Sequence, residues 1–397
     1  MTLVRRRRAL VLLFLACTLV ATAVPAASAA TTQSARRSVV ASAACIPGWR
    51  LVRRVAVRGQ DVLMVGISAV RADDAWALGE IVSDDSLVPI VEHWNGGGWH
   101  RVALPRRVTS HFDDTDLWGA FGASSAGNFW AFTLNGHYLS LRGKHWTAGV
   151  VPRVSEIEAA RVFSPRDVWV FGNKLVGGTT FNPRFRPYAA NFNGRRWRTV
   201  PVPGRADIVA VSALSRSNMF AVTGPVDSGA AAAPRVLHWD GNAWAAGPVQ
   251  PRLSRHAMFY TILAQSDASL WIGGSAPINS KETTDAVRHW DGTSWSNATP
   301  PGARSGLEDL VVSLAGDGRG GLWALGLDYS SGTDQLWHNT GGTWSAPVTP
   351  HRSIGQLAAV PGSTLNWAVG SDKIRGHYIG VIVEHRATRC RSAKQAR

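Results

Sequence analysis

The stretch His289-Trp290-Asp291-Gly292-Thr293-Ser294-Trp295 is the clearest copy of a short pattern that recurs along this 397-residue chain. His238-Trp239-Asp240-Gly241-Asn242-Ala243-Trp244 is a second full copy, and His93-Trp94-Asn95-Gly96-Gly97-Gly98-Trp99 is a close one. An Asp-Gly or Asn-Gly pair between two β-type segments is a strong hairpin signal, because such turns need positive φ. The pattern therefore predicts a tight turn followed by a strand that begins with Trp.

A second pattern, an apolar run centred on Trp and followed by Gly, precedes each hairpin. It is clearest at Asp74-Ala75-Trp76-Ala77-Leu78-Gly79 and Asp167-Val168-Trp169-Val170-Phe171-Gly172, and a further apolar run such as Ile208–Val211 comes before it. The other copies are centred on Trp130, Phe220, Trp271, Trp323 and Trp367. The mean spacing of about 48 residues is typical of propeller repeats. Four short strands per repeat predict an all-β fold, a seven-bladed β-propeller of four-stranded antiparallel blades over residues 45–390.

The two ends of the repeat region complement each other. The seventh copy has Trp367 and a strand at Ile379–His385, but no closing Trp follows. The missing strand is present at the other end, at Pro47-Gly48-Trp49-Arg50-Leu51-Val52. We therefore expect the N-terminal strand to join the last blade and close the ring. Cys45 and Cys390 would then lie beside the same turn, which favours a disulfide in an exported protein, with two free thiols or an intermolecular bond as alternatives.

These motifs resemble those of the kelch-like, galactose-oxidase-like propellers. Gly273-Gly274 matches the glycines that those families place after the second strand, and Trp290 and Trp295 match their aromatic and strand-opening Trp. The hairpin also looks like the Asp-box of sialidase-type propellers, which has one further residue between Asp and Trp. The resemblance implies architecture only: the copper site of the oxidases needs a Cys cross-linked to a Tyr, and both cysteines of the repeat region already have the predicted disulfide role. We expect no cofactor.

The N-terminus reads as an export signal. Residues 1–29 combine Arg5 to Arg8, an apolar stretch at Ala9–Val20 and a small-x-small site at Ala27-Ser28-Ala29, as a signal peptide does. The general and the twin-arginine routes both stay open, and lipid modification of Cys17 is an alternative. Residues 30–44 are expected to form a disordered leader and residues 391–397 a basic tail. The prediction is a secreted protein, extracellular or associated with the cell wall.

The charge of the chain favours anionic partners. The formal net charge is +15, and it is still +11 after removal of residues 1–29, which hold four Arg and no acid. Such a balance suits an anionic polysaccharide, a cell-envelope polymer or an acidic protein surface; a biased composition with a solvated surface would give the same charge. We expect no specific nucleic-acid partner and a monomer. No stretch after the signal approaches the length of a membrane span.

Arginine recurs in the linkers that lead into each repeat. In a propeller these linkers and the hairpins between the second and third strands open on one face, so the arginines would form a positive rim around the central channel. Abundant Arg in polar linkers is the alternative interpretation. The predicted rim residues are Arg58, Arg106, Arg153, Arg205, Arg252, Arg304 and Arg352.

Two long insertions between second and third strands add candidates, because loops on a rigid scaffold often carry function. The insertion at residues 173–187 contains Arg184 and Arg186, and the insertion at residues 225–234 contains an Ala run. Most of the 18 tryptophans occupy repeat positions and are expected to pack between blades. Trp118, on an inner strand of the second repeat and outside the repeat marks, is the candidate for ligand contact.

Acidic and histidine residues give weaker predictions. Asp113, Asp114 and Asp116 could bind calcium, although a solvated loop is the preferred interpretation because they lack the glycine and spacing of a calcium loop. Paired carboxylates in linkers could do acid–base work; the candidates are Glu156, Glu158, Glu308 and Asp309. Five histidines at one repeat position would lie on different blades, so we expect structural roles rather than a metal site; they are His93, His238, His289, His338 and His385.

Three functions remain from these observations. The leading hypothesis is an exported, non-catalytic binding module that recognises an anionic polymer or a protein through its Arg-rich face. The alternative is a hydrolase or lyase that acts on polysaccharides with carboxylates and Arg at the channel mouth. A mainly structural wall protein is the third. The fold alone does not decide among them, because propellers host both binding and catalysis.

Overall fold

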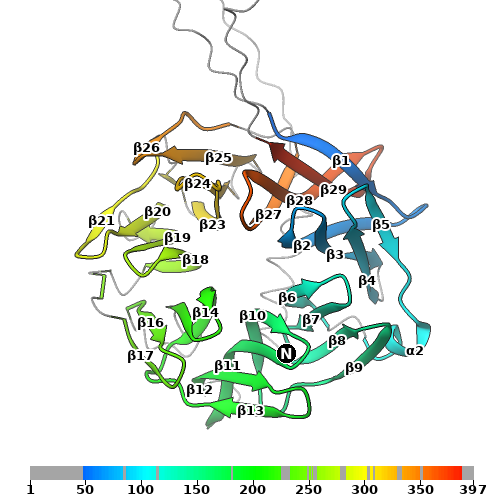
Figure 1. The fold of residues 1–397 in the computed structure, drawn as a ribbon, viewed down its shortest axis with the longest axis horizontal. Helices are drawn as coiled ribbons and strands as arrows, with labels where there is room; N and C mark the ends of the chain where they lie inside the picture. Colours follow the sequence, from blue (N-terminus) through cyan, green and yellow to red (C-terminus); the bar gives the residue numbers. More distant parts are fainter. Residues whose placement is uncertain are drawn as a thin grey trace, which may run out of the picture.

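The computed structural model describes residues 48–83, 86–112, 116–179, 182–224, 233–247, 250–251, 253, 257–277, 283–301, 305–306, 309–328, 333–348 and 352–386. Within these residues the chain forms seven antiparallel sheets arranged in a ring (Figure 1), each with four strands on its main path. The one helix in the described part, α2 (Arg106–Thr109), is a single turn. The all-β, seven-bladed architecture predicted from the repeats is confirmed.

Each blade runs from an innermost to an outermost strand in chain order, except the last. Blades one to three comprise β2 (Asp61–Arg71), β3 (Asp74–Ser83), β4 (Ser86–Trp94) and β5 (Trp99–Val102); β6 (Trp118–Ser125), β7 (Asn128–Thr133), β8 (His137–Arg142) and β9 (His145–Val150); and β10 (Glu156–Ser164), β11 (Asp167–Thr179), β12 (Asn182–Phe192) and β13 (Trp197–Val200). Blade four comprises β14 (Asp207–Ser215), β15 (Asn218–Gly224), β16 (Val236–Trp239) and β17 (Trp244–Ala246).

The remaining blades follow the same order. Blade five comprises β18 (Met258–Ser266), β19 (Ser269–Pro277), β20 (Thr283–Trp290) and β21 (Trp295–Asn297), and the short β22 (Ser305–Gly306) also pairs with β20. Blade six comprises β23 (Asp309–Gly316), β24 (Leu322–Asp328), β25 (Thr333–Thr340) and β26 (Thr343–Trp344). Blade seven comprises β27 (Ser353–Ala359), β28 (Leu365–Ile374), β29 (His377–Arg386) and β1 (Arg50–Val55).

The outer strand of blade seven therefore comes from the beginning of the described chain. β1 pairs antiparallel with β29, with Arg50 opposite Glu384 and Val55 opposite Gly380. Glu384 is buried and accepts hydrogen bonds from the guanidinium groups of Arg50 and Arg386. The predicted disulfide partners Cys45 and Cys390, the signal peptide, the leader and the tail lie outside the described residues, so these remain predictions.

The Trp on the second strand of one blade contacts the Trp that opens the outer strand of the neighbouring blade. Trp130 on β7 lies edge-on to Trp197 on β13, with 6.1 Å between ring centroids, and Trp271 on β19 lies 6.3 Å from Trp344 on β26. Trp323 packs in the same way against Trp49, at 5.4 Å, so Trp49 takes the place of the missing closing Trp of blade seven. The prediction that the repeated tryptophans pack between blades is confirmed.

The histidines on third strands support these tryptophans. The ring of His93 packs against Trp76 at 4.3 Å between centroids, and its Nε2 lies 2.9 Å from Asp74 Oδ1. His338 stacks on Trp323 and bonds Asp317 in the same way. The corresponding ring partners of His238 and His289 are Phe220 and Trp271. The prediction that the five histidines share one repeat position is wrong for His385. That residue pairs with Asn366, one place before Trp367, and Glu384 takes the repeat position.

The predicted Asp-Gly and Asn-Gly hairpins are also present. Asn95 Oδ1 accepts hydrogen bonds from the N–H groups of Gly97 and Gly98 at 3.0 and 3.1 Å. Asp291 accepts the equivalent bonds in blade five and a further one from the Thr293 hydroxyl. The hydroxyl bond first, and then the backbone bonds, lower the pKa of its carboxyl. Gly96 and Gly292 have φ of 88° and 92°, a conformation in which glycine carries no steric cost.

All seven innermost strands carry a bulge at the same point, where one extra residue interrupts the pairing with the second strand. In β18 the register of pairing with β19 shifts between Phe259 and Thr261, and Tyr260 is the extra residue. The extra residues around the ring are Val65, Gly119, Glu158, Val209, Tyr260, Val312 and Gly355. Bulges bend a strand and re-aim a side chain, so each blade has one residue whose direction is set by the bulge and not by the regular alternation of the strand.

One predicted loop is instead a paired extension of a blade, with a register shift between Leu175 and Gly177. The insertion at residues 173–187 continues β11 and β12, with Lys174 opposite Arg186 and Gly177 opposite Arg184. Of the second insertion, residues 225–232 lie outside the described residues.

Candidate functional site

Two kinds of connection meet on one face of the ring, which we call the linker face. Because neighbouring strands are antiparallel, the start of each innermost strand lies beside the end of the second strand: Asp61 pairs with Val82, and Ser353 with Ser371. The linker face therefore holds the segments at 56–60, 103–117, 151–155, 201–206 and 345–352, as far as these are described. The opposite face, the turn face, holds the tight turns within each blade.

The predicted arginine rim is distributed unevenly over this face. Arg58, Arg153 and Arg205 are exposed and lie two or three residues before β2, β10 and β14. Arg352 is paired instead, with Nε 3.1 Å from Asp372 Oδ2. Arg106 belongs to α2, which contacts the outer strand β9 and lies at the periphery of the ring in Figure 1.

The other predicted site residues lie in three different places. Arg252 and Arg304 are outside the described residues. Arg184 and Arg186 are exposed on the extension of β12. Trp118 lines the central cavity described below, and its ring packs at 4.9 Å from Phe112. Trp118 immediately precedes the bulge of β6, a place where the other blades bury residues such as Ile157 and Phe259, so its packing role accounts for its position.

The predicted acidic loop is only partly described. Asp113 and Asp114 lie outside the described residues, as does Glu308. Asp116 is 1% exposed and its Oδ1 lies 2.7 Å from His137 Nδ1. The prediction of a solvated loop is therefore wrong for Asp116, because this carboxylate is buried against His137 at the start of β8. Among the residues the structure describes, no group of three or more His, Cys, Asp and Glu side chains is placed to hold a metal ion.

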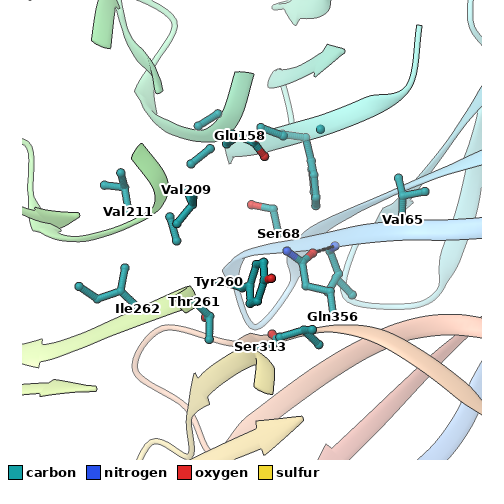
Figure 2. A pocket seen from close by; sticks show the side chains of 18 of the residues that line it. Val65, Ser68, Glu158, Val209, Val211, Tyr260, Thr261, Ile262, Ser313 and Gln356 are labelled. Atoms are coloured by element: carbon teal, nitrogen blue, oxygen red, sulfur yellow. Dashed lines mark hydrogen bonds between the residues drawn. The ribbon is translucent and has the colours of Figure 1, made fainter. Parts of the chain in front are cut away.

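The innermost strands of all seven blades enclose a cavity of about 300 Å³ on the ring axis. Six of the seven bulge residues line it, and Figure 2 shows Val65, Glu158, Val209 and Tyr260 around it. The side chain of Tyr260 is 39% exposed, so solvent reaches this space. The bulges give the cavity one carboxylate and one phenol, in blades three and five, among aliphatic side chains and glycine.

Several polar residues of the cavity wall join neighbouring blades. Gln356 Oε1 accepts a hydrogen bond of 2.7 Å from the N–H of Ile67, and Figure 2 shows this side chain at the wall. Ser68 Oγ accepts from Ala123 N–H at 3.3 Å, and Ser313 Oγ accepts from Leu357 N–H at 3.1 Å. These bonds satisfy backbone donors on innermost strands, which have no further strand on their inner side. They leave the hydroxyl protons and the Gln356 amide protons as donors.

Arg161 adds a positive charge to the wall. It lies on β10 opposite Trp169, and its Nη1 donates a hydrogen bond of 2.7 Å to Ala160 O. Burial lowers the pKa of its guanidinium to about 10, so the group is still charged at neutral pH. The residues opposite the corresponding aromatics of the other blades are uncharged, namely Ser68, Gly122, Ser212, Leu263, Ala315 and Ala358.

A group of polar side chains lies at the start of the innermost strands of blades three and four. Asn173 Nδ2 donates to both Glu156 Oε2 and Asp207 Oδ2, at 3.0 Å each. Asp207 and Asn173 are buried. One amide thus brings two carboxylates together on the linker-face side of the ring, and Glu156 is one of the acids singled out in the sequence.

Comparison with protein-family models gave no match, and comparison with curated proteins gave none. Solved structures are similar in fold. "YCF48 bound to D1 peptide" has a TM-score of 0.53 and 11% identity, over 86% of this chain and 97% of that one. The GH74 xyloglucanase from Xanthomonas campestris also has a TM-score of 0.53, with 14% identity over 83% of this chain and 54% of that one. These likenesses establish the propeller fold alone.

The similar folds include a peptide-bound protein and a hydrolase. A propeller of this kind is therefore compatible with binding and with catalysis. The kelch-like or galactose-oxidase-like resemblance remains a prediction. In the described residues no helix has the length and apolarity of a membrane crossing.

Two residues of the cavity, Arg161 and Tyr260, were not predicted from the sequence. The signal that could have found them is a departure from the repeat. Arg161 stands where the other blades have small or aliphatic residues, and Tyr260 stands at the bulge position, where the other blades have Val, Gly or Glu. A charged or aromatic residue that breaks a repeat is more informative about function than one that the repeat shares, because shared residues mostly serve packing.

Proposed function

We propose that this chain is an exported binding propeller that presents its linker face to an anionic partner, either a polysaccharide, another cell-envelope polymer or an acidic protein surface. Export follows from the signal-like N-terminus and the basic charge favours anions. The structure supports the proposal through exposed cations on one face of a rigid ring, which is how binding residues are usually displayed.

One observation carries the proposal. Arg58, Arg153 and Arg205 come from three separate linkers, all are exposed, and no carboxylate of the described residues lies within ion-pair distance of them. By contrast, Arg352 on the same face is paired with Asp372. Unpaired guanidinium groups can each make two parallel hydrogen bonds to a carboxylate or sulfate of a partner.

The test is a charge-neutral replacement of these three residues, Arg58→Gln, Arg153→Gln and Arg205→Gln together. We expect binding to immobilised heparin, used as a sulfated polysaccharide probe, to weaken about tenfold, because three screened ion pairs of about 0.5 kcal/mol each are lost. Equilibrium binding measured at 50 and 200 mM salt should also show a smaller salt dependence for the variant, because fewer charged contacts remain.

The matched control removes the same charge from the turn face. Arg166, Arg195 and Arg319 are exposed in turns of blades three and six, and their replacement by Gln should change the affinity less than twofold. Equal losses in both triple variants would show that only net charge matters. Binding that does not respond to salt would also contradict the proposal.

The alternative function, a polysaccharide hydrolase or lyase, is supported by one observation, the carboxylates of Glu156 and Asp207 that share the Asn173 amide. Two neighbouring carboxyl groups are the minimum for acid–base cleavage of a glycosidic bond. Release of reducing ends from xyloglucan or polygalacturonate, abolished by Glu156→Gln, would favour this alternative. Binding without product release would favour the binding propeller.

A further inference from the structure

We infer that the central cavity is a binding site for a single carboxylate group attached to a small apolar body, with Arg161 as its charged anchor. This site is separate from the proposed polymer-binding linker face and does not depend on it. The inference starts from the surroundings of Arg161 and from the lining of the cavity.

Arg161 is half-buried and lines the cavity, and the one hydrogen bond of its guanidinium to a described residue goes to the neighbouring carbonyl of Ala160. No ion pair to Arg161 is present in the described part of the chain. Burial is the cause that lowers its pKa, and no carboxylate offsets that effect. A buried charge without a partner is costly. An anion that enters the cavity from solvent could compensate the charge of Arg161.

Neutral donors complete the polar part of the site. The Gln356 side chain uses its oxygen for Ile67 N–H, and its amide group remains available to donate. The Ser68 and Ser313 oxygens likewise accept backbone bonds, which leaves their hydroxyl protons free to turn toward a ligand. These side chains come from blades one, six and seven, across the ring from Arg161 on blade three, so a ligand on the axis could be reached from several sides.

The charge balance favours a carboxylate over phosphate or sulfate. Arg161 is the one arginine in the described lining of the cavity, and Glu158 on the same strand also lines it. A doubly charged anion would therefore be repelled more strongly than a single carboxylate, which matches the planar fork of one Arg. The walls also contain Val209, Ile262 and Phe121, and a cavity of about 300 Å³ is at the small end of ligand sites. The ligand is therefore a small apolar acid or the C-terminal residue of a peptide.

The experiment uses calorimetric titration of the whole chain with phenylacetate and isovalerate, each compared with its neutral amide. It also uses N-acetyl-Ala-Leu with a free and with an amidated C-terminus. We expect the carboxylates to bind and the amides to bind at least tenfold more weakly, because the amide lacks the charge that Arg161 compensates. Tighter binding of the peptide acid than of the free acids would identify a chain terminus as the source of the carboxylate. Comparable binding would identify small acids.

Two variants test the anchor. Arg161→Met should weaken carboxylate binding about tenfold to hundredfold, as expected for loss of a charge-assisted pair, and leave amide binding unchanged. Arg198→Met is the matched control, because Arg198 is exposed on the outer strand β13 of the same blade; its affinity should equal that of the original chain. Arg161→Lys keeps the charge without the planar fork and should show an intermediate loss, which also serves if the Met variant does not fold.

A second readout separates binding from a structural role. If Arg161 is held unpaired for a ligand, Arg161→Met should unfold at a urea concentration no lower than the original chain does in the absence of ligand. A strongly lowered midpoint together with unchanged carboxylate binding would overturn the inference. So would the absence of binding for all the acids, equal binding of acids and amides, or a preference for sulfate.

Discussion

Replacing Gly274 with alanine is expected to lower the free energy of unfolding by about 3 kcal/mol, the upper part of the range for forced overpacking. Gly274 lies on β19 opposite the bulge of β18. A Cβ at this position would overlap the carbonyl oxygen of Met258 and lie 2.6 Å from Phe259 Cα. Both obstacles are backbone atoms of the paired strand, so they cannot move aside as a flexible side chain could. Urea unfolding followed by Trp fluorescence measures the effect.

Gly316→Ala is the control for this prediction. Gly316 is also in a strand, β23, and a Cβ there would meet no atom within 4 Å. Its replacement should change stability by less than about 0.5 kcal/mol or raise it slightly, because alanine reduces the freedom of the unfolded chain. The same backbone overlap occurs at Gly172 with Glu156 O and at Gly370 with Ser353 O. Equal stability of Gly274→Ala and Gly316→Ala would show that the bulge tolerates a side chain.

Glu80→Gln is expected to make the protein more stable at pH 8 by about 3 kcal/mol and to have little effect at pH 5. Glu80 on β3 is 2% exposed, and burial raises the pKa of its carboxyl from 4.5 to about 7. The folded state therefore holds this proton more tightly than the unfolded state does. Its favourable contribution is complete below the unfolded pKa and is lost as the pH rises through about 7.

The measurement is urea unfolding of both proteins at several pH values from 5 to 8. The difference between them should grow with pH across this window. Asp334 also has a pKa raised by burial, to about 7, so part of the pH dependence should remain in Glu80→Gln. Asp73→Asn removes an exposed carboxylate in the turn after β2 and serves as the control for loss of a negative charge. A constant difference between Glu80→Gln and the original chain would contradict the assignment.

The repeat architecture could be predicted because the residues that define it are close together in the sequence. The turns at Asn95-Gly96 and Asp291-Gly292 need backbone conformations that favour glycine, and these were visible as letters in the sequence. The tryptophans recur at a fixed place, since each must fill the same gap between two blades, as Trp130 and Trp197 do. Periodicity of this kind survives a low similarity among the copies.

The site was harder to predict because it depends on register and on contacts between distant segments. The bulge that places Tyr260 and Glu158 on the cavity wall leaves no mark in composition, since Val, Gly, Glu and Tyr all occupy it. The pairing of Arg352 with Asp372 and the peripheral position of Arg106 likewise follow from where each linker runs. Counting linker arginines therefore overestimated the number that share one surface.

The bulges make the side chains that line the cavity independent of the strand register. A residue such as Val209 or Val312 is additional to the ladder of hydrogen bonds and is not part of the register on either side. Exchanging its side chain changes the lining of the cavity and leaves the strand pairing in register, and the inner part of the hydrophobic core beside Val209 and Val312 must adapt to the new side chain. Six such positions line the cavity around one axis, so its ligand preference could change in evolution one blade at a time while the strand pairing of the scaffold stays constant.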